Sequence, residues 1–563
     1  MRLVKGTTLV ALVLATGTAG AQTPATPERS SAVVHGDLGR QFDEYLSRLE
    51  ALGYSGGLAV TKRGETVLLK GYGKADRERG SPMGPDAVFN LGSITKPFTA
   101  AAILRLQELG QLRTGDPIAR FFERVPEDKA AITLEHLLTH SSGLESDFSP
   151  TDYEPTTREE YVRRALASKL LFTPGLGYEY ANAGYSLLAA VVETVTGKDY
   201  ESALGELVLK PAGMAETGYK APRWAPTRIA HGYREGQDWG TILGRIQDPG
   251  APFWALRGNG GLHTTLADMV RWNAALQGDA VLTAASRESY VRPRVAEGPG
   301  ARSHYAFGWA VETTPHGTLV QHNGGNGIYV AELLRFVDEG VMIFLASTVA
   351  ELKATPVVPA LTAIVFGEPY DLPPAVATIS PETLRVRAGR YRAPSGAELE
   401  VRAVDGGLEI VTTEPAGFAL LAGVPAGEGE RYARLGVRTA DIAGRSFNGD
   451  PTGIHEALGG RLDLEQIRQQ DAQLTRDREA RLGPYRGFAV VGSSPYGGGR
   501  VETTVRVDFE KGSVFNRFLW GPRDGLVGLQ AGPQRRVSFE GEGGSTVLVI
   551  PGPDGPVRLP RVP

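Results

Sequence analysis

The chain has 563 residues, 41% of them hydrophobic and 22% charged, which is the composition of a globular protein with two to four domains. Its formal net charge of −4, without any long basic run, excludes the electrostatic pattern of a nucleic-acid-binding protein. The count of zero cysteines excludes disulfides, cysteine nucleophiles, cysteine-ligated zinc and a lipid anchor on cysteine.

The N-terminus has the pattern of a secretory signal peptide. Two basic residues precede a short apolar core, and the small residues Ala19 to Ala21 provide a cleavage site. This core is too short to cross a bilayer, and no other stretch approaches the ~20 apolar residues that a transmembrane helix needs. We therefore expect a cleaved signal at 1–21, a disordered lead-in at 22–35, and a secreted or periplasmic protein without a transmembrane anchor.

The first predicted elements are a helix and a hairpin. Apolar residues recur at helical spacing over 37–52, which predicts an amphipathic helix. Two β-prone runs, 57–62 and 66–70, flank a polar turn that contains Gly64 and predict a hairpin.

A largely apolar segment that begins near Ser93 predicts a buried helix ending at Gly110. Pro97 is tolerated only in a first turn, so Ser93 lies at the N-terminus, among unpaired backbone N–H groups. Lys96 follows three residues later on the same face, with Cβ atoms about 5–6 Å apart. A serine hydroxyl beside a lysine is a workable nucleophile, although the pair alone also fits an N-cap serine and a surface lysine.

A short helix is predicted over 134–140, capped by Thr133, with His136 and His140 on one side of it. The glutamate of the zinc-protease pattern does not follow the first histidine. We therefore expect these histidines to fix a loop rather than to bind a metal.

An extended segment carries Tyr180 and Asn182, whose spacing of two aims both side chains to one side. It leads into an apolar helix predicted over 186–196 and closed by Gly197. Tyrosine can pass protons when a neighbouring cation lowers its pKa, and asparagine can both donate to and accept from an amide.

Farther along, residues 260–272 predict a glycine-rich turn followed by a capped helix. Three strands are predicted at 318–323, 328–336 and 341–346, forming an antiparallel meander that the early hairpin could extend. His322 lies on the first of these strands, whose flanking glycines indicate that another group approaches the backbone closely.

Three of these segments occur in the order and approximate spacing of the serine β-lactamase-related family: Ser93-Ile94-Thr95-Lys96, Tyr180-Ala181-Asn182 and His322-Asn323-Gly324. Over residues 36–368 the sequence most resembles the branch that contains class C β-lactamases, D-aminopeptidases and bacterial esterases. The resemblance implies an α+β, β-lactamase/transpeptidase-like fold, in which helices flank an antiparallel sheet and form an all-helical subdomain.

The resemblance also implies roles for individual residues. Ser93 would attack an acyl carbonyl, with Lys96 and Tyr180 sharing its proton, and the sequence leaves open which of the two is the base. The backbone N–H groups of Ser93 and Gly325 would form the oxyanion hole. Three residues would contact the substrate: Asn182, His322 and Gly324. No cofactor or metal is implied, the substrate would be a small-molecule ester, peptide or β-lactam, and partner proteins are unknown.

His322 departs from the lysine that many true β-lactamases and penicillin-binding proteins carry at this place. Because histidine is largely neutral near pH 7, this favours esterases and D-amino-acid peptidases over β-lactam hydrolysis. We therefore expect an exported serine hydrolase that forms an acyl-enzyme. The alternative is a non-catalytic or adduct-forming protein of the penicillin-binding or sensor type.

The tail beyond a linker at 369–383 is predicted to be β-rich. Short strands indicate a small β-barrel-like domain at 384–453, and 454–563 would hold a helix and a second β-rich module. Phe518 and Trp520 are expected in its core.

Overall fold

The computed structural model describes residues 31–562 apart from 147–151, 235–236, 246–252, 299, 351, 374, 376–379, 405–406, 412–416, 418–419, 421–428, 460–462, 498–499, 522–525, 532–537, 541–546 and 551–556. The predicted signal peptide at 1–21 lies outside the described residues. None of the described helices is long and apolar enough to cross a lipid bilayer.

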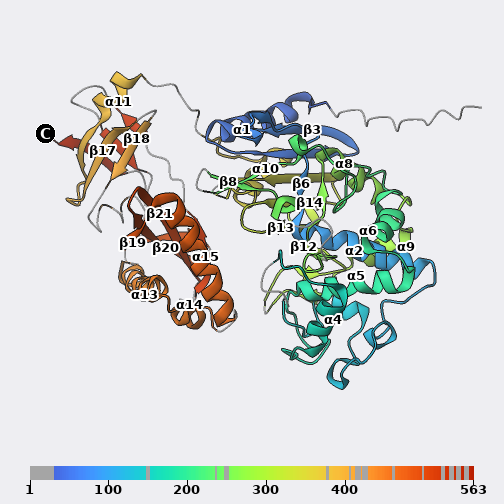
Figure 1. Cartoon of the computed structure of the whole chain (residues 1–563). Helices are drawn as coiled ribbons and strands as arrows, with labels where there is room; N and C mark the ends of the chain where they lie inside the picture. Colours follow the sequence, from blue (N-terminus) through green and yellow to red (C-terminus); the bar gives the residue numbers. More distant parts are fainter. Residues whose placement is uncertain are drawn as a thin grey trace, which may run out of the picture.

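A nine-stranded antiparallel sheet organises the first two thirds of the chain (Figure 1). Its spatial order is β1 (Val33–Val34), β3 (Glu65–Tyr72), β2 (Gly56–Lys62), β15 (Val341–Ser347), β14 (Val330–Phe336), β13 (Gly317–Gly325), β12 (Ala310–Thr314), β11 (His304–Tyr305) and β10 (Val295–Ala296). The predicted hairpin turns through Arg63 and Gly64, both with positive φ, which suits the twist of a tight hairpin. The meander β13–β14–β15 is extended by β2, so the predicted α+β architecture is confirmed.

Helices cover both faces of this sheet. One face packs against α1 (Gly36–Ala51) and α10 (Val358–Phe366) in a core that includes Phe42 and Leu361. The other face packs against α2 (Thr95–Glu108) and α8 (Leu266–Ala275), followed by the helices of the subdomain. Residues 95–104 of α2 are all buried, which explains why its sequence is apolar almost all round.

The helical subdomain packs beside α2 (Figure 1). Its helices are α3 (Leu134–Leu138), α4 (Arg158–Ala167), α5 (Asn182–Thr196) and α6 (Tyr200–Leu204). Further short elements are α7 (Ile242–Arg245), α9 (Ala284–Val291), the pair β4 (Lys74–Asp76) and β5 (Ser81–Pro82), the pair β6 (Phe89–Asn90) and β9 (His263–Thr264), and the pair β7 (Gly232–Arg234) and β8 (Gln237–Gly240).

The structure differs from the sequence-based expectations at several element ends. The lead-in expected to be disordered at 22–35 contains β1, whose β-branched residues pair with the edge of β3. Helix α3 ends at Leu138, so His140 lies beyond it with a φ of +57°, and the expectation that both histidines face one side of a helix is wrong. Helix α5 begins at Asn182 rather than at residue 186.

Strands from both ends of the tail meet in one six-stranded sheet. Its order is β18 (Gly407–Val411), β17 (Glu398–Val404), β16 (Gly389–Arg392), β25 (Val557–Val562), β24 (Val547–Ile550) and β23 (Ser538–Glu540). The short helix α11 (Pro381–Arg387) precedes it. Tyr391 of β16 pairs with Arg561 of β25, a contact between distant residues that no local pattern specifies.

The middle of the tail forms a separate core. It combines α13 (Gly429–Phe447), α14 (Thr452–Ala457) and α15 (Leu464–Leu482) with a sheet of β19 (Tyr485–Gly497), β20 (Arg500–Phe509), β21 (Gly512–Trp520) and β22 (Leu526–Ala531). The expected boundary at residue 453 therefore separates α13 from the sheet on which it packs. Phe518 and Trp520 are buried in this core, as predicted.

Replacing the buried Leu559 of β25 by aspartate tests the pairing of the two tail ends. A carboxylate in this core costs several kcal/mol, so hydrogen exchange should accelerate in residues 389–404, while α13 and β20 stay protected. Mass-spectrometric hydrogen exchange measures both regions. The control is Arg558→Gln, a substitution of the exposed residue next to Leu559. Unchanged hydrogen exchange at residues 389–404 in Leu559→Asp would contradict the pairing of β16 with β25.

Candidate active site

Ser93 lies on a 3₁₀ turn, Gly92–Ile94, that runs directly into α2. The turn is held from behind, because the N–H of Gly92 donates to Oδ1 of Asn90 at 3.0 Å and the N–H of Leu91 donates to the Leu262 carbonyl at 2.8 Å. Ser93 therefore sits at the positive end of the helix dipole, where backbone N–H groups can bind developing negative charge.

Lys96 is fully buried, and its Nζ contacts three oxygen atoms from separate parts of the chain. It lies 2.9 Å from Ser93 Oγ, 2.8 Å from Asn182 Oδ1 and 3.0 Å from the carbonyl oxygen of Asn259. The structure thus brings together three residues that the sequence singled out. It adds a fourth, Asn259, which the sequence reasoning missed.

Asn259 lies in the glycine-rich run that precedes α8, and its side chain fixes its own backbone. The amide Nδ2 donates to Ser186 Oγ and to the Ala255 carbonyl, both at 2.7 Å. The carbonyl is thereby held toward Lys96. The only sequence signal was the glycine-rich run itself, in which Gly258 has a φ of +77° and a Cβ would approach the Tyr185 carbonyl to 2.4 Å.

Tyr180 is half-buried beside Ser93 and Lys96. Lys96 Nζ lies 4.6 Å from the centre of its ring, and its hydroxyl is hydrogen-bonded with the Ser93 side chain. Burial raises the pKa of Tyr180 above its usual value, although the hydrogen bond with Ser93 opposes the rise. Desolvation, and not a neighbouring cation, therefore sets the direction of this pKa shift, and the phenol keeps its proton at neutral pH.

His140 supports the segment that carries Tyr180. Its Nδ1 accepts a hydrogen bond from the Ala181 N–H at 3.0 Å, and its ring lies 4.2 Å from that of Tyr180, centre to centre. Burial lowers the pKa of His140 well below its usual value, and the charge of Lys96 adds to this. His140 is therefore a neutral side chain that positions the loop.

His322 is buried on β13, with both ring nitrogens engaged by the protein. Nδ1 lies 2.6 Å from the Asn323 carbonyl, which can only accept, so Nδ1 carries the proton and Nε2 accepts from the Tyr305 hydroxyl at 2.9 Å. Burial lowers the pKa of His322 to about 3, and the charge of Lys96 contributes. The sequence-based expectation that His322 contacts the substrate, at a carboxylate or at the leaving group, stays a prediction; a neutral ring whose nitrogens both bond to the protein supplies no positive charge for a carboxylate.

The end of β13 packs directly against the turn that carries Ser93. A Cβ on Gly324 would lie 2.0 Å from the Leu91 carbonyl oxygen and 2.7 Å from the Ser93 nitrogen. A Cβ on Gly92 would lie 2.4 Å from the Gly325 nitrogen. Glycine is therefore required on both segments, and the backbone nitrogens of Ser93 and Gly325 belong to neighbouring segments.

Two tyrosines that the sequence reasoning did not single out complete the surroundings of Lys96. The ring of Tyr185 lies 5.7 Å from Lys96 Nζ, and its hydroxyl donates to the Leu138 carbonyl at 2.7 Å. Tyr305 stacks at a tilt on His140 while it donates to His322. The sequence signal for these two tyrosines was their position next to the recognised motifs. Aromatic residues are common in hydrophobic cores, so this signal does not distinguish a tyrosine of the active site from one of the core.

The neutral state of His322 predicts a pH-dependent stability. Its folded pKa of about 3 lies below the unfolded value of about 6.5, so its stabilising contribution is complete above pH 6.5 and is lost as the pH falls toward 3. The gap in unfolding free energy between wild type and His322→Gln should therefore narrow by about 2–3 kcal/mol from pH 7 to 4.5. Denaturant unfolding across this range measures it, and a constant gap would contradict a buried neutral His322.

Comparisons with known proteins agree with this architecture. The chain is 28% identical over 338 residues to penicillin-binding protein 4* of Bacillus subtilis strain 168, covering 57% of this chain and 74% of that protein. It is 34% identical over 239 residues to esterase EstB of Burkholderia gladioli, covering 39% of this chain and 60% of the esterase.

Solved structures show the same fold. An octameric penicillin-binding protein homologue from Pyrococcus abyssi superposes with a TM-score of 0.54 at 23% identity, covering 68% of this chain and 89% of that chain. D-amino acid amidase from Ochrobactrum anthropi SV3 has a TM-score of 0.51 at 23% identity, covering 59% and 99%. At this identity the likeness concerns the fold alone.

The family model described as Beta-lactamase matches residues 42–360, more than half of the chain. This span includes Ser93, Lys96, Tyr180 and the end of β13, so the match covers the whole cluster described above. The chain belongs to the beta-lactamase family.

Proposed function

We propose that the protein is a serine hydrolase that cleaves ester or amide bonds through an acyl-enzyme on Ser93. The observation that carries the proposal is the 2.9 Å contact between Lys96 Nζ and Ser93 Oγ at the N-terminus of α2. Family membership and the 34% identity to an esterase support it. Export from the cell is part of the proposal and rests on the N-terminal sequence pattern.

Lys96 and Tyr180 both lie within hydrogen-bond reach of the Ser93 hydroxyl among the described residues. Lys96 Nζ is at hydrogen-bond distance from Oγ, whereas Tyr180 already holds its own proton because burial raises its pKa. We assign Lys96 as the acceptor of the Ser93 proton once the amine has lost its own proton to solvent: the neutral amine donates to Asn182 Oδ1 and the Asn259 carbonyl, and its lone pair faces Ser93 Oγ. Tyr180 is the donor that protonates the leaving group. Water then attacks the acyl-enzyme, and the proton transfers run in reverse.

Negative charge on the substrate carbonyl would develop next to two backbone N–H groups, those of Ser93 and Gly325. The close packing of Gly92 and Gly324 holds these segments together, and one such donor is typically worth ~10²–10³ in rate. Asn182 accepts a hydrogen bond from Lys96 at its Oδ1, which leaves its amide N–H groups to donate to the acyl part of the substrate.

The electrostatics of the site favour substrates without a carboxylate next to the scissile bond. His322 is neutral and both of its nitrogens are engaged, so the side chain supplies no positive charge. Small esters and amides of D-amino acids fit this better than β-lactams, whose carboxylate would need a cation. The 34% identity to esterase EstB agrees with a preference for esters.

A second candidate function is a penicillin-binding or sensor-type protein that acylates Ser93 and releases the product very slowly. The likeness to penicillin-binding protein 4* favours it, because the same nucleophile and lysine serve both functions. The two candidates differ only in the rate of deacylation.

Turnover of three chromogenic substrates tests the proposal: p-nitrophenyl butyrate, D-alanine p-nitroanilide and a chromogenic cephalosporin. The ester and the anilide should turn over faster than the cephalosporin. Ser93→Ala should lower kcat/KM by ~10³ or more, because it removes the proposed nucleophile. Ser202→Ala, an exposed serine in the first turn of α6, is the matched control and should keep wild-type rates.

The outcomes separate the two candidates. Stoichiometric acylation of Ser93 without turnover, seen by mass spectrometry, would favour the sensor-type protein. Neither turnover nor an adduct would rule out both candidates.

A further inference from the structure

A cavity of about 290 Å³ lies apart from the Ser93 cluster, between the end of β14 and helices α8 and α9. None of the residues assigned to the active site lines it. Its size is at the small end of ligand pockets. Most of its wall is apolar and comes from six residues: Leu276, Tyr290, Val291, Phe336, Val337 and Val341.

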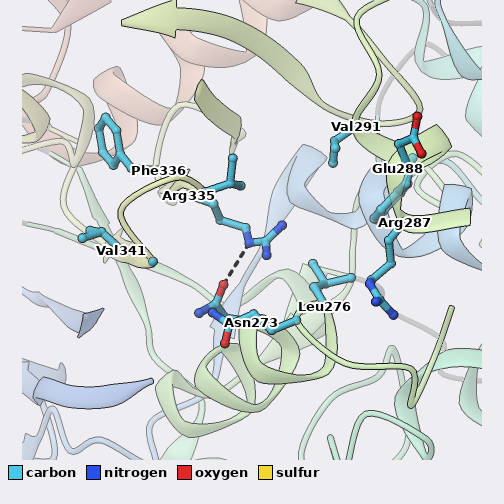
Figure 2. A pocket seen from close by; sticks show the side chains of 12 residues that line it. Asn273, Leu276, Arg287, Glu288, Val291, Arg335, Phe336 and Val341 are labelled. Carbon is cyan, nitrogen blue, oxygen red and sulfur yellow. Dashed lines mark hydrogen bonds between the residues drawn. The ribbon is translucent and has the colours of Figure 1, made fainter. Parts of the chain in front are cut away.

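A buried arginine points into this cavity. Arg335 faces the α2 and α8 side of β14, where the alternating strand positions Ala331 and Leu333 carry core side chains. Its side chain is 92% buried, and Figure 2 shows it reaching from β14 toward Asn273 on α8, with Leu276 and Val291 nearby. The Nε–H donates to Asn273 Oδ1 at 2.9 Å.

Among the described residues, Arg335 forms no ion pair, and its hydrogen-bond partner is the neutral Asn273, which is unusual for a buried guanidinium. Arg287, on the opposite wall, shows the ordinary arrangement, since it pairs with Asp279 and donates to the Leu282 carbonyl at 2.8 Å. Burial lowers the pKa of Arg335 to about 10, so it remains charged at neutral pH. An unpaired charge at this depth is costly unless something else accepts its hydrogen bonds.

We propose that this cavity is a second binding site, which takes a small organic monocarboxylate with an apolar tail. The two carboxylate oxygens accept hydrogen bonds from the terminal nitrogens of Arg335, whose planar fork matches a carboxylate. The tail packs against Leu276 and Val291. Phosphate has no apolar tail to fill the apolar wall, so a carboxylate with such a tail fits the cavity better than phosphate.

The site lies directly behind the catalytic helix. The hydroxyl of Tyr290, which lines the cavity, donates to the Pro97 carbonyl at 2.5 Å, one residue beyond Lys96. The cavity nevertheless does not contact Ser93, so binding there does not depend on the proposed hydrolase activity.

Isothermal titration calorimetry of the full chain with sodium benzoate tests the proposal. Wild type should bind one equivalent with a Kd on the order of 1 mM, while benzyl alcohol and inorganic phosphate should bind much more weakly. Arg335→Met keeps an unbranched apolar side chain but removes the guanidinium group, and it should weaken benzoate binding about tenfold or more. Equal binding by wild type and a folded Arg335→Met, or phosphate binding as tight as benzoate, would overturn the proposal.

A variant that should bind benzoate more tightly provides an independent test if Arg335→Met fails to fold. Glu288 is 77% exposed and lies 3.4 Å from Arg292 in a surface ion pair. Glu288→Gln should therefore fold, and because it removes a negative charge near the cavity and leaves Arg292 unpaired, it should tighten benzoate binding about twofold. Glu159→Gln on α4, where the side chain is 75% exposed, is the matched control and should leave the affinity unchanged. The same affinity in Glu288→Gln as in Glu159→Gln would contradict a site at this cavity.

Discussion

The active site depends on a fully buried amine that contacts the nucleophile one turn earlier and two oxygen atoms from distant segments. Lys96 Nζ contacts Ser93 one turn earlier, Asn182 at the start of α5, and the Asn259 carbonyl in the loop before α8. A buried amine is costly unless such partners are present, so the site exists only when the sheet and the helical subdomain are packed together. The packing that stabilises the folded domain therefore also places Lys96 beside Ser93.

Two layers of support hold this contact in place. On the sheet side, Gly92 and Gly324 let β13 touch the turn of Ser93, at distances where a Cβ would collide with backbone. On the helical side, His140 is neutral because it is buried, and it fixes the Tyr180 segment through the Ala181 N–H. Desolvation acts on Tyr180, His140 and His322 in the same sense, keeping each of them uncharged around Lys96.

Local chemistry made part of this structure predictable from the sequence. Pro97 indicates the first turn of the catalytic helix, and Gly110 lies just beyond its end. The spacing of Ser93 and Lys96 on one face followed from helical geometry. The Asn259 carbonyl was not predictable, because backbone groups carry no sequence signature. The pairing of β16 with β25 was missed for another reason, since strand patterns indicate strands but not their distant partners.

The most direct test of this account is to trap the acyl group during turnover of p-nitrophenyl butyrate by acid quench and to map it by peptide mass spectrometry. Wild type should carry a butyryl group on the peptide containing Ser93, and Lys96→Met, which keeps a long side chain without an amine, should carry none on the same time scale. A butyryl group on another residue, or equally fast acylation of Ser93 in Lys96→Met, would contradict the central role of the contact between Ser93 and Lys96.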